Sequence, residues 1–279
     1  MMDALAPGAT IGILGGGQLG RMLALAAAPL GFHVHIYAPE AESPAEEAAT
    51  TLTRAGYGDE AALKAFAASV DVITYEFENV PAGCAALLSA LKPVRPGAKA
   101  LEVAQDRVIE KSFMRSIGLG TAPFAKADDA EEARAAFAAL GGAEAIVKTR
   151  RLGYDGKGQA RVASAEAAAE AVAGFGAPCI LEGLVSFTKE ISVVAARGID
   201  GRIEAFEPAD NTHVGGILRR SVAPAQLKPQ MAAEAWRIAG TILEALGYVG
   251  VMGVELFVDR DGTLLVNEIA PRVHNSGHW

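Results

Sequence analysis

Short apolar runs alternate with amphipathic stretches of helical period at the start of the chain. The pattern predicts strands at residues 10–14, 33–37 and 70–75, and helices at residues 21–29 and 59–68. Because repeated strand–helix units usually build a parallel sheet, we predict a parallel, doubly wound α/β sheet in this region. Prolines and a glycine in the stretch at residues 92–97 mark a candidate domain boundary.

Beyond that boundary the pattern predicts a mixed α+β organisation. A helix is expected over residues 98–117, followed by a smaller α+β unit over residues 124–182. In that unit Asp128, with Glu131 three residues later, has the spacing of a helix cap, and Ser164 caps a second helix. The remaining expected elements are strands at residues 145–149, 191–195, 251–258 and 263–269 and a helix at residues 230–246.

The acidic composition changes which partners are expected. The chain has 25 Lys and Arg residues against 33 Asp and Glu residues, a net charge of −8, and no basic tract, which argues against nucleic-acid and membrane binding. It has no run of the ~18 apolar residues that a membrane span needs and no signal-peptide pattern at its start. Cys84 and Cys179 lie in apolar surroundings and are interpreted as buried free thiols, so we expect a cytoplasmic protein.

The first motif with candidate chemistry is Gly15-Gly16-Gly17-Gln18-Leu19-Gly20, between an expected strand and an expected helix. It fits the glycine pattern of dinucleotide-binding turns, in which the backbone approaches a phosphate at a helix N-terminus. The acidic residue that such turns require after the second strand is poorly placed, because Ala38 and Pro39 occupy that point. A phosphate ligand other than a dinucleotide is therefore the favoured interpretation; a dinucleotide site and a purely structural turn stay open.

Two further segments could bind a nucleotide. Lys148 on a predicted strand precedes a glycine-rich stretch at residues 153–159, in which backbone N–H groups and lysines suit a triphosphate. The spacing is not that of a Walker loop, and a solvated hairpin turn is the alternative. The apolar strand at residues 179–182 leads to a linker at residues 183–185 whose backbone could pair with the edge of an adenine; alone, this pattern indicates only a buried strand.

The last two predicted strands flank Asp259-Arg260-Asp261-Gly262, a strong hairpin signal. Depending on the turn, Glu255 pairs with Val266 or with Glu268, and either register places Glu255 and Glu268 on one face. Two close carboxylates need a cation between them, and Mg²⁺ accepts a few carboxylates while it keeps water and phosphate ligands. Asn267 joins them only if the strand bulges there, and two solvated glutamates are the alternative interpretation.

Together these motifs resemble the ATP-grasp superfamily, and within it most closely the 5-(carboxyamino)imidazole ribonucleotide synthases. The resemblance rests on segments at residues 15–22, 75–81, 153–159, 246–251 and 267–279, which run from one end of the chain to the other. It implies an α/β and α+β chain with the ATP-grasp fold. The implied domains are a Rossmann-like (pre-ATP-grasp) domain at residues 1–98, a truncated core at residues 99–123 and 183–279, and a lid subdomain at residues 124–182.

The resemblance also implies roles for individual residues. ATP would lie between lid and core, with Mg²⁺, or Mn²⁺ in its place, held by Glu255 and Glu268. The other ATP contacts would come from Arg107, Lys148, Gly153, Tyr154, Asp155, Gly156, Lys157, Gly158, Gln159, Glu182, Gly183, Leu184, Val185, Glu190, His213, Asn267 and Glu268. Aminoimidazole ribonucleotide would contact Gly15, Gly16, Gly17, Gln18, Leu19, Glu76, Arg272, His274 and Asn275, its phosphate approaching the turn at Gly15, Gly16 and Gly17.

The implied activity is the ATP-dependent ligation of carbon to nitrogen in purine biosynthesis. Bicarbonate attacks the γ-phosphate of ATP, and the amine of 5-aminoimidazole ribonucleotide captures the carboxyl group of the resulting carboxyphosphate. Arg272 would stabilise carboxyphosphate, and Tyr154 and Asp155 would close the site against water. The resemblance further implies a homodimer. The family pattern continues past Trp279, so we expect that a C-terminal region, which would complete the core and the substrate-phosphate site, is missing.

Three other classes of function stay open. A related ATP-grasp enzyme, such as a formate-using transformylase or a biotin carboxylase, would share the acyl-phosphate chemistry. An oxidoreductase would use the turn at residues 15–20 for a nicotinamide cofactor, and a non-catalytic nucleotide-binding fragment would fit the early end of the chain. The co-substrate that ATP turnover requires, or the binding of NADH without ATP, separates these alternatives.

Overall fold

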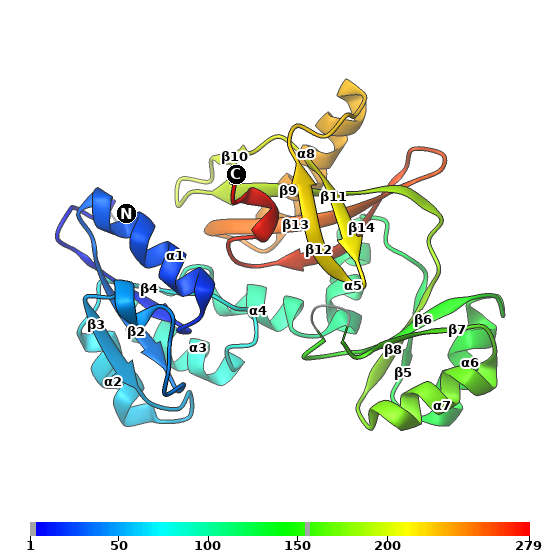
Figure 1. Cartoon of the computed structure of the whole chain (residues 1–279), viewed down its shortest axis with the longest axis horizontal. Coiled ribbons are helices and arrows are strands. Elements are labelled where there is room, and N and C mark those ends of the chain that lie inside the picture. Colours follow the sequence, from blue (N-terminus) through cyan, green and yellow to red (C-terminus); the bar gives the residue numbers. More distant parts are fainter. Residues whose placement is uncertain (1–3, 154–156) are drawn as a thin grey trace. The chain divides into compact units, whose positions relative to one another are not determined.

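The chain folds into two compact units, each of which collects segments from distant parts of the sequence. A computed structural model describes residues 4–153 and 157–279 (Figure 1). Unit 1 consists of Met1–Leu101, Tyr248–Val251 and Pro271–Val273. Unit 2 consists of Glu102–Gly247, Met252–Ala270 and His274–Trp279.

Unit 1 contains a four-stranded parallel sheet in the order β3-β2-β1-β4, which confirms the predicted parallel arrangement. Its strands are β1 (Thr10–Leu14), β2 (His33–Ala38), β3 (Thr51–Arg54) and β4 (Val72–Tyr75). Strand β3 was not among the predicted elements. The helices along this part of the chain are α1 (Gln18–Ala27), η1 (Ala28–Leu30), η2 (Glu46–Ala48), α2 (Glu60–Ala68), α3 (Ala82–Ser89) and α4 (Ala98–Ala104).

Two separate apolar clusters show that helices cover both faces of this sheet, as the doubly wound prediction requires. Leu14 and Tyr37 pack with side chains of α2 and α3 in one cluster. Ile13 and Ile36, one position earlier on the same strands, pack with α1 in the other. This alternation follows from the two-residue period of a strand. Gly12 permits the close approach of α2, because a Cβ there would lie 2.6 Å from Cζ of Phe66.

The first part of unit 2 is a four-stranded antiparallel sheet in the order β5-β8-β6-β7. Its strands are β5 (Phe124–Ala127), β6 (Ala145–Thr149), β7 (Gln159–Val162) and β8 (Cys179–Gly183), and its helices are α6 (Ala130–Ala139) and α7 (Ala165–Phe175). Both helices bury alanines and apolar side chains against the sheet. Ser164 caps α7 as predicted, but α6 is capped by Asp129 and not by Asp128. Asp128 is instead paired with Lys126 and Arg150.

The second part of unit 2 is a larger sheet in the order β12-β11-β9-β13-β14, with β10 paired to β9. Its strands are β9 (Phe187–Arg197), β10 (Ile203–Ala205), β11 (Ala209–Val214), β12 (Ile217–Val222), β13 (Gly250–Asp259) and β14 (Leu264–Ala270). The helices are α5 (Arg107–Ser116), α8 (Pro229–Ala245) and the short η3 (Asn275–Gly277). In the described part of the chain, no helix is long and apolar enough to cross a membrane.

The single helix predicted over residues 98–117 is wrong, because the chain breaks between α4 and α5. Asp106 has an extended backbone, and its side chain accepts the N–H groups of Val108 and Ile109 as an N-cap. A capped helix start satisfies donors that would otherwise have no partner. The break therefore makes Arg107 the first residue of α5.

Candidate active site

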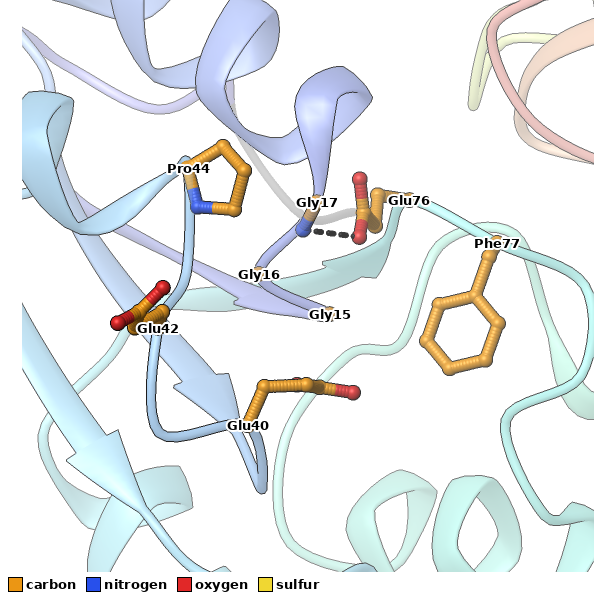
Figure 2. A pocket seen from close by; sticks show the side chains of 8 residues that line it. All are labelled: Gly15, Gly16, Gly17, Glu40, Glu42, Pro44, Glu76 and Phe77. Atoms are coloured by element: carbon orange, nitrogen blue, oxygen red, sulfur yellow. Dashed lines mark hydrogen bonds between the residues drawn. The ribbon is translucent and has the colours of Figure 1, made fainter.

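The glycine turn of unit 1 joins β1 to α1 and is filled by a carboxylate of the chain itself (Figure 2). Glu76, just after β4, accepts the N–H of Gly17 at 2.5 Å and the N–H of Gly20 at 2.6 Å. A Cβ at Gly17 would lie 2.6 Å from Oε1 of Glu76, so only glycine allows this contact. A carboxylate at a helix N-terminus is stabilised by the free N–H groups and by the helix dipole.

This arrangement limits how a phosphate could use the turn. The donors of Gly17 and Gly20 are taken by Glu76, so a substrate phosphate would not receive them while this contact persists. The predicted substrate residues Gln18 and Leu19 open α1 at the same place. A pocket beside the turn is lined by Gly15, Gly16, Gly17, Glu40, Glu42, Pro44, Glu76 and Phe77.

Arg272, the predicted carboxyphosphate ligand, is paired within unit 1 with a carboxylate that the sequence interpretation did not assign. Its Nε lies 2.5 Å from Oε2 of Glu78, and its Nη1 donates to the backbone oxygen of Val273 at 2.9 Å. Both side chains are largely buried, at 18% and 29% exposure. Glu78 lies in the turn after β4, where no periodic pattern of the sequence singles it out.

In unit 2 the acidic hairpin has one of the two predicted pairings of Glu255, although a bulge and not the position of the turn produces it. Glu255 on β13 pairs directly with Glu268 on β14, whereas the next residue, Leu256, pairs with Val266. Asn267 is therefore the extra residue of a β-bulge, which confirms the condition set for its joining the two carboxylates. Its Nδ2 donates to Oε2 of Glu255 at 3.4 Å, and its Oδ1 is buried without a hydrogen-bond partner in the described structure.

Three side chains of helix α5 contact strand β14 of this hairpin. Arg107 Nη1 donates to Oε2 of Glu268 at 2.8 Å, and Lys111 Nζ donates to the backbone oxygen of Asn267 at 3.1 Å. Between them, Glu110 accepts the N–H of Ile269 at 2.7 Å. Residues three and four apart on a helix share a face, which explains why all three reach β14.

These contacts separate the pKa values of two neighbouring carboxyls. Desolvation raises the pKa of Glu268, but the Arg107 guanidinium, together with Lys148 and Lys111, outweighs it and holds the pKa at about 2. Burial, and then the negative charge of Glu268, raise the pKa of Glu110 to about 8 against the opposing charges of Lys111 and Arg107. Glu268 is therefore the ionised member, suited to a cation, and Glu110 is protonated at neutral pH.

The predicted nucleotide residues Lys148 and Glu182 lie against each other, with Lys111 as an unpredicted third member. Glu182 Oε2 lies 2.8 Å from Nζ of Lys148, and Oε1 lies 3.4 Å from Nζ of Lys111. Burial alone would raise the pKa of Glu182, but the two lysines lower it. The Glu182 carboxylate thus pairs with two ammonium groups. The predicted adenine contacts at residues 182–185 would therefore come from backbone groups of that segment.

Glu190 and His213, predicted to lie near the ribose and the nucleotide, form a pair on neighbouring strands. Asn211 on β11 is opposite Glu190 on β9, so His213 lies two residues along on the same face. Burial raises the pKa of Glu190, and the charge of Glu255 raises it further, against the effect of His213. The two side chains are in contact and half-buried on the sheet that carries the acidic hairpin.

His274, predicted to contact the aminoimidazole ribonucleotide, turns both ring nitrogens towards groups of unit 2. Its Nε2 lies 3.2 Å from Oε1 of Glu255, and its Nδ1 lies 2.8 Å from Oγ of Ser276. The side chain is 10% exposed. Both ring nitrogens thus have neighbours within unit 2, and the adjacent Asn275 begins η3 and is exposed.

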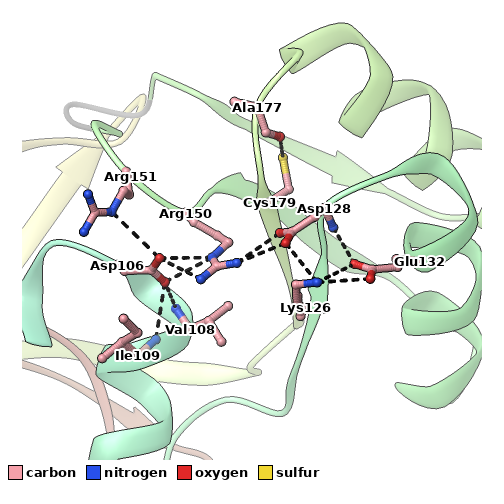
Figure 3. A network of polar contacts seen from close by, with 10 residues as sticks. All are labelled: Asp106, Val108, Ile109, Lys126, Asp128, Glu132, Arg150, Arg151, Ala177 and Cys179. Carbon is pink, nitrogen blue, oxygen red and sulfur yellow. Dashed lines mark hydrogen bonds and ion pairs between the residues drawn. The ribbon is translucent and has the colours of Figure 1, made fainter.

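A network around Arg150 connects the elements that carry Arg107 and Lys148 (Figure 3). Arg150 follows β6 directly and donates from Nε and Nη2 to Asp106, at 3.1 and 2.8 Å, and from Nη1 to Asp128 at 3.1 Å. The backbone oxygen of Arg150 also accepts the N–H of Arg107 at 3.0 Å. No periodic pattern could predict this network, because its members lie far apart in the chain.

Some predicted site residues cannot be placed. Tyr154, Asp155 and Gly156 lie outside the described residues. Gly153 and Lys157 lie on either side of these three residues. The backbone oxygen of Gly158 accepts the N–H of Thr149 at 2.8 Å, and Gln159 begins β7. Among residues 4–153 and 157–279, no three or more histidine, cysteine or carboxylate side chains form a cluster that could hold a metal ion. The hairpin offers two carboxylates and one amide.

Comparisons with known proteins agree with this division of the chain. Residues 8–105 match the family model of the ribonucleotide synthetase preATP-grasp domain, and residues 112–279 match that of the ATP-grasp domain. The N5-carboxyaminoimidazole ribonucleotide synthase of Brucella melitensis is 52% identical over 279 residues, which cover 99% of this chain and 77% of that protein.

Solved structures show the same similarity. The N5-carboxyaminoimidazole synthetase of Staphylococcus aureus, complexed with ADP, superimposes with a TM-score of 0.94 at 37% identity, covering 99% of this chain and 74% of that one. The Aspergillus clavatus enzyme, in complex with ADP and 5-aminoimidazole ribonucleotide, gives a TM-score of 0.87 at 25% identity, covering 98% and 72%. The chain therefore belongs to the N5-carboxyaminoimidazole ribonucleotide synthase family of ATP-grasp ligases.

Proposed function

We propose that this chain uses ATP and bicarbonate to carboxylate 5-aminoimidazole ribonucleotide in purine biosynthesis, with ADP and phosphate as the other products. The observation that carries the proposal is the bulged hairpin, which brings Glu255, Asn267 and Glu268 together beside Arg107. Two carboxylates and an amide beside a guanidinium suit a metal–nucleotide complex. The relatives that bind ADP, or ADP with 5-aminoimidazole ribonucleotide, support the same assignment.

Mg²⁺, or Mn²⁺ in its place, fits the hairpin on two observations. The buried Oδ1 of Asn267 has no hydrogen-bond partner in the described structure, and an unsatisfied buried oxygen is costly unless it has a ligand. Glu255 and Glu268 face each other on paired strands, and like charges so placed need a cation. When bound, the ion would neutralise the charge of the ATP phosphates. Oxygen-only ligands suit Mg²⁺ and leave positions for phosphate and water.

The ATP contacts are proposed for the cations and backbone groups around this hairpin. Arg107 and Lys148 would hold phosphate oxygens. Arg107 would do so while it stays paired with Glu268, and Lys148 while it stays paired with the buried Glu182. The segment at residues 153–159 would close over the phosphates. The backbone at residues 182–185 would bind the adenine, and Glu190 with His213 would lie at the ribose and the nucleotide.

The reaction proceeds by attack of a bicarbonate oxygen on the γ-phosphorus, which forms carboxyphosphate and releases ADP. The amine of 5-aminoimidazole ribonucleotide then captures the carboxyl carbon as phosphate leaves. The protein contributes charge and position rather than covalent chemistry. Arg272 would neutralise the carboxyphosphate, and Tyr154 and Asp155 would exclude water from it.

Release of Arg272 from Glu78 is part of that role. The Arg272 side chain is 18% exposed and already contacts Glu78 and the Val273 carbonyl, so an incoming anion would exchange with Glu78 rather than recruit a solvated arginine. Gln18, Leu19, Glu76, His274 and Asn275 are proposed as acceptor contacts. Because Glu76 holds the N–H groups of the glycine turn, its position is fixed before the substrate arrives.

Three broader assignments are proposed with the activity. The protein acts in the cytoplasm and assembles as a homodimer. Its domains are a Rossmann-like domain at residues 1–98, a core at residues 99–123 and 183–279, and a lid at residues 124–182. The four-stranded sheet that contains β5 to β8, with α6 and α7 packed on it, supports the lid assignment.

The test is the release of ADP with each co-substrate supplied or omitted. We expect release that depends on bicarbonate and rises with 5-aminoimidazole ribonucleotide. A requirement for formate in place of bicarbonate would instead favour a transformylase of the same superfamily. Glu268→Gln should abolish the metal-dependent rate, and Glu204→Gln is the matched control, because Glu204 is 70% exposed on β10 and pairs only with Arg202 among the interactions described for it.

A further inference from the structure

Arg150 connects strand β6 with the start of helix α5 through its guanidinium (Figure 3). Each of the three guanidinium nitrogens donates to a carboxylate. Nε donates to both oxygens of Asp106 at 3.1 Å, and Nη2 donates to Oδ2 of the same residue at 2.8 Å. Nη1 donates to Oδ1 and Oδ2 of Asp128 at 3.2 and 3.1 Å. Charge-assisted contacts at several atoms fix both the distance and the orientation of the two groups.

The contact with Asp106 fixes the first turn of α5, which begins with Arg107. Oδ1 of Asp106 caps this helix, because it accepts two backbone N–H groups of the first turn at 3.0 and 3.3 Å. The backbone oxygen of Arg150 separately accepts the N–H of Arg107 at 3.0 Å. The side chain and the backbone of Arg150 therefore both hold the turn from which the Arg107 guanidinium reaches Glu268.

The backbone of Arg150 also contacts the strands that carry the Lys148 site. Lys148 lies on β6, two residues before Arg150. The N–H of Arg150 donates to the backbone oxygen of Pro178 at 2.9 Å, directly before β8. Strand β8 in turn carries Glu182, which accepts from Nζ of Lys148 at 2.8 Å. Arg150 thus joins the start of α5 to both strands that set the position of the Lys148 ammonium group.

Asp106 depends on Arg150 more than Asp128 does. Asp106 is 5% exposed, and the next cation described for it is Arg151 at 3.8 Å, whose side chain is 58% exposed. Asp128 also pairs with Lys126 at 2.9 Å. A buried carboxylate that loses its close partner is strongly destabilised. Loss of the Arg150 guanidinium should therefore displace the start of α5 more than it disturbs the sheet.

We infer that Arg150 is a positioning residue for the phosphate site. Through Asp106 it holds the first turn of α5, so that Arg107 and Lys148 are kept at one spacing for the nucleotide phosphates. The inference rests on the proposed function, which assigns phosphate oxygens to Arg107 and Lys148. Arg150 precedes the glycine-rich segment at residues 153–159, a place that also suits a direct phosphate ligand, but its guanidinium is paired with two carboxylates.

Two substitutions distinguish positioning from direct contact with a phosphate. Arg150→Gln removes the guanidinium. Asp106→Asn leaves Arg150 in place, and its amide oxygen can still cap α5, because asparagine and aspartate are similarly good N-caps. A direct phosphate ligand would be lost only in the first variant, whereas a positioning residue would fail in both. Arg161→Gln is the matched control, since Arg161 lies on β7 of the same sheet, is 61% exposed and pairs with Glu144.

The primary measurement is the affinity for Mg-ADP by isothermal titration calorimetry, with the affinity for 5-aminoimidazole ribonucleotide measured beside it. We expect Arg150→Gln and Asp106→Asn each to bind ADP about 10–100-fold more weakly, because a charge-assisted contact of Arg107 with phosphate is lost. Arg161→Gln should match the native protein, and binding of 5-aminoimidazole ribonucleotide should stay unchanged in all three. Weaker ADP binding in only one of the first two variants, or an equal loss for both ligands, would overturn the inference.

A double-mutant cycle tests whether the effect passes through Arg107. In an Arg107→Gln protein, Asp106→Asn should weaken ADP binding much less than it does in the native protein, because the group that it misplaces is already absent. Fully additive losses would contradict the inference. Unchanged ADP binding by Asp106→Asn alone overturns it as well, whether or not Arg150→Gln folds. If the native protein binds no Mg-ADP, the nucleotide site of the proposed function is refuted instead.

Discussion

Lys111 offers a sharp test of how unit 2 is held together, because its ammonium group is buried. The side chain is 1% exposed, and Nζ lies 3.1 Å from the backbone oxygen of Asn267 and 3.4 Å from Oε1 of Glu182. Lys111→Met keeps most of the aliphatic volume and removes the charge. It would leave the Asn267 carbonyl without this donor and Glu182 with Lys148 alone.

The expected cost follows from those contacts. Removing one partner of a buried ion pair typically costs ~3–5 kcal/mol. Since Lys148 stays 2.8 Å from Glu182, we expect a value near the lower limit, about 3 kcal/mol. For a unit of this size, a loss of 1 kcal/mol lowers Tm by roughly 2–4 °C, so the predicted decrease is about 6–12 °C.

Tryptophan fluorescence measures this change selectively. The chain has 2 tryptophans, and both Trp236 and Trp279 belong to unit 2. Lys228→Met is the matched control, because Lys228 is exposed and should change Tm very little. The double variant Lys111→Met with Glu182→Gln should lose less stability than the sum of the single variants, since no unpaired carboxylate is left. A Lys111→Met protein that melts within 2 °C of the native protein, on the scale of ~2–4 °C per kcal/mol, would refute the reasoning.

Three further predictions concern other groups. The pKa of Glu110 is raised to about 8, so the folded state keeps a proton that the unfolded state releases above the ordinary carboxyl pKa of 4.5. The stability of unit 2 should therefore fall as pH rises between these values, and Glu110→Gln should flatten that slope in urea titrations. An unchanged slope would contradict the assignment. Burial raises the pKa of the Cys84 thiol to about 11 and also raises that of Cys179. Both thiols should therefore resist alkylation at pH 8 until urea is added. Rapid labelling of either thiol in the native protein would refute their burial. Glu76→Gln should raise KM for 5-aminoimidazole ribonucleotide about 10–100-fold, because the amide cannot accept both N–H groups of the turn. Glu47→Gln is the control, because the Glu47 side chain is 74% exposed. An unchanged KM in Glu76→Gln would remove Glu76 from the acceptor site.

Much of the fold could be predicted because local patterns and tertiary structure agree. The apolar runs of β1 and β2 and the hairpin of β13 and β14 lie where periodicity placed them. Polar or short strands were missed, such as β3 and β11, because their side chains are half-exposed and their pattern does not differ from that of a loop. Such strands are fixed by backbone pairing with a neighbour, which a local pattern does not contain.

The candidate site shows the same limit at the level of single residues. The carboxylate pair at Glu255 and Glu268 could be predicted, since both strands are local to one turn. The partners that orient the site could not, because Arg150 reaches Asp106 across 44 residues and Lys111 reaches Asn267 across 156. These contacts are set by how the sheets and α5 pack. The sequence therefore predicted the proposed ligands, and the structure was needed to find the groups that contact them.

The central claim is that bicarbonate is activated by phosphorylation before it reacts with the amine. The most direct measurement uses [¹⁸O]bicarbonate with ATP and 5-aminoimidazole ribonucleotide, followed by mass spectrometry of the phosphate released. Attack of a bicarbonate oxygen on the γ-phosphorus, and later cleavage of its bond to carbon, predict that one ¹⁸O is transferred to phosphate in each turnover. Formation of the carboxylated product with no ¹⁸O in the phosphate would contradict the account.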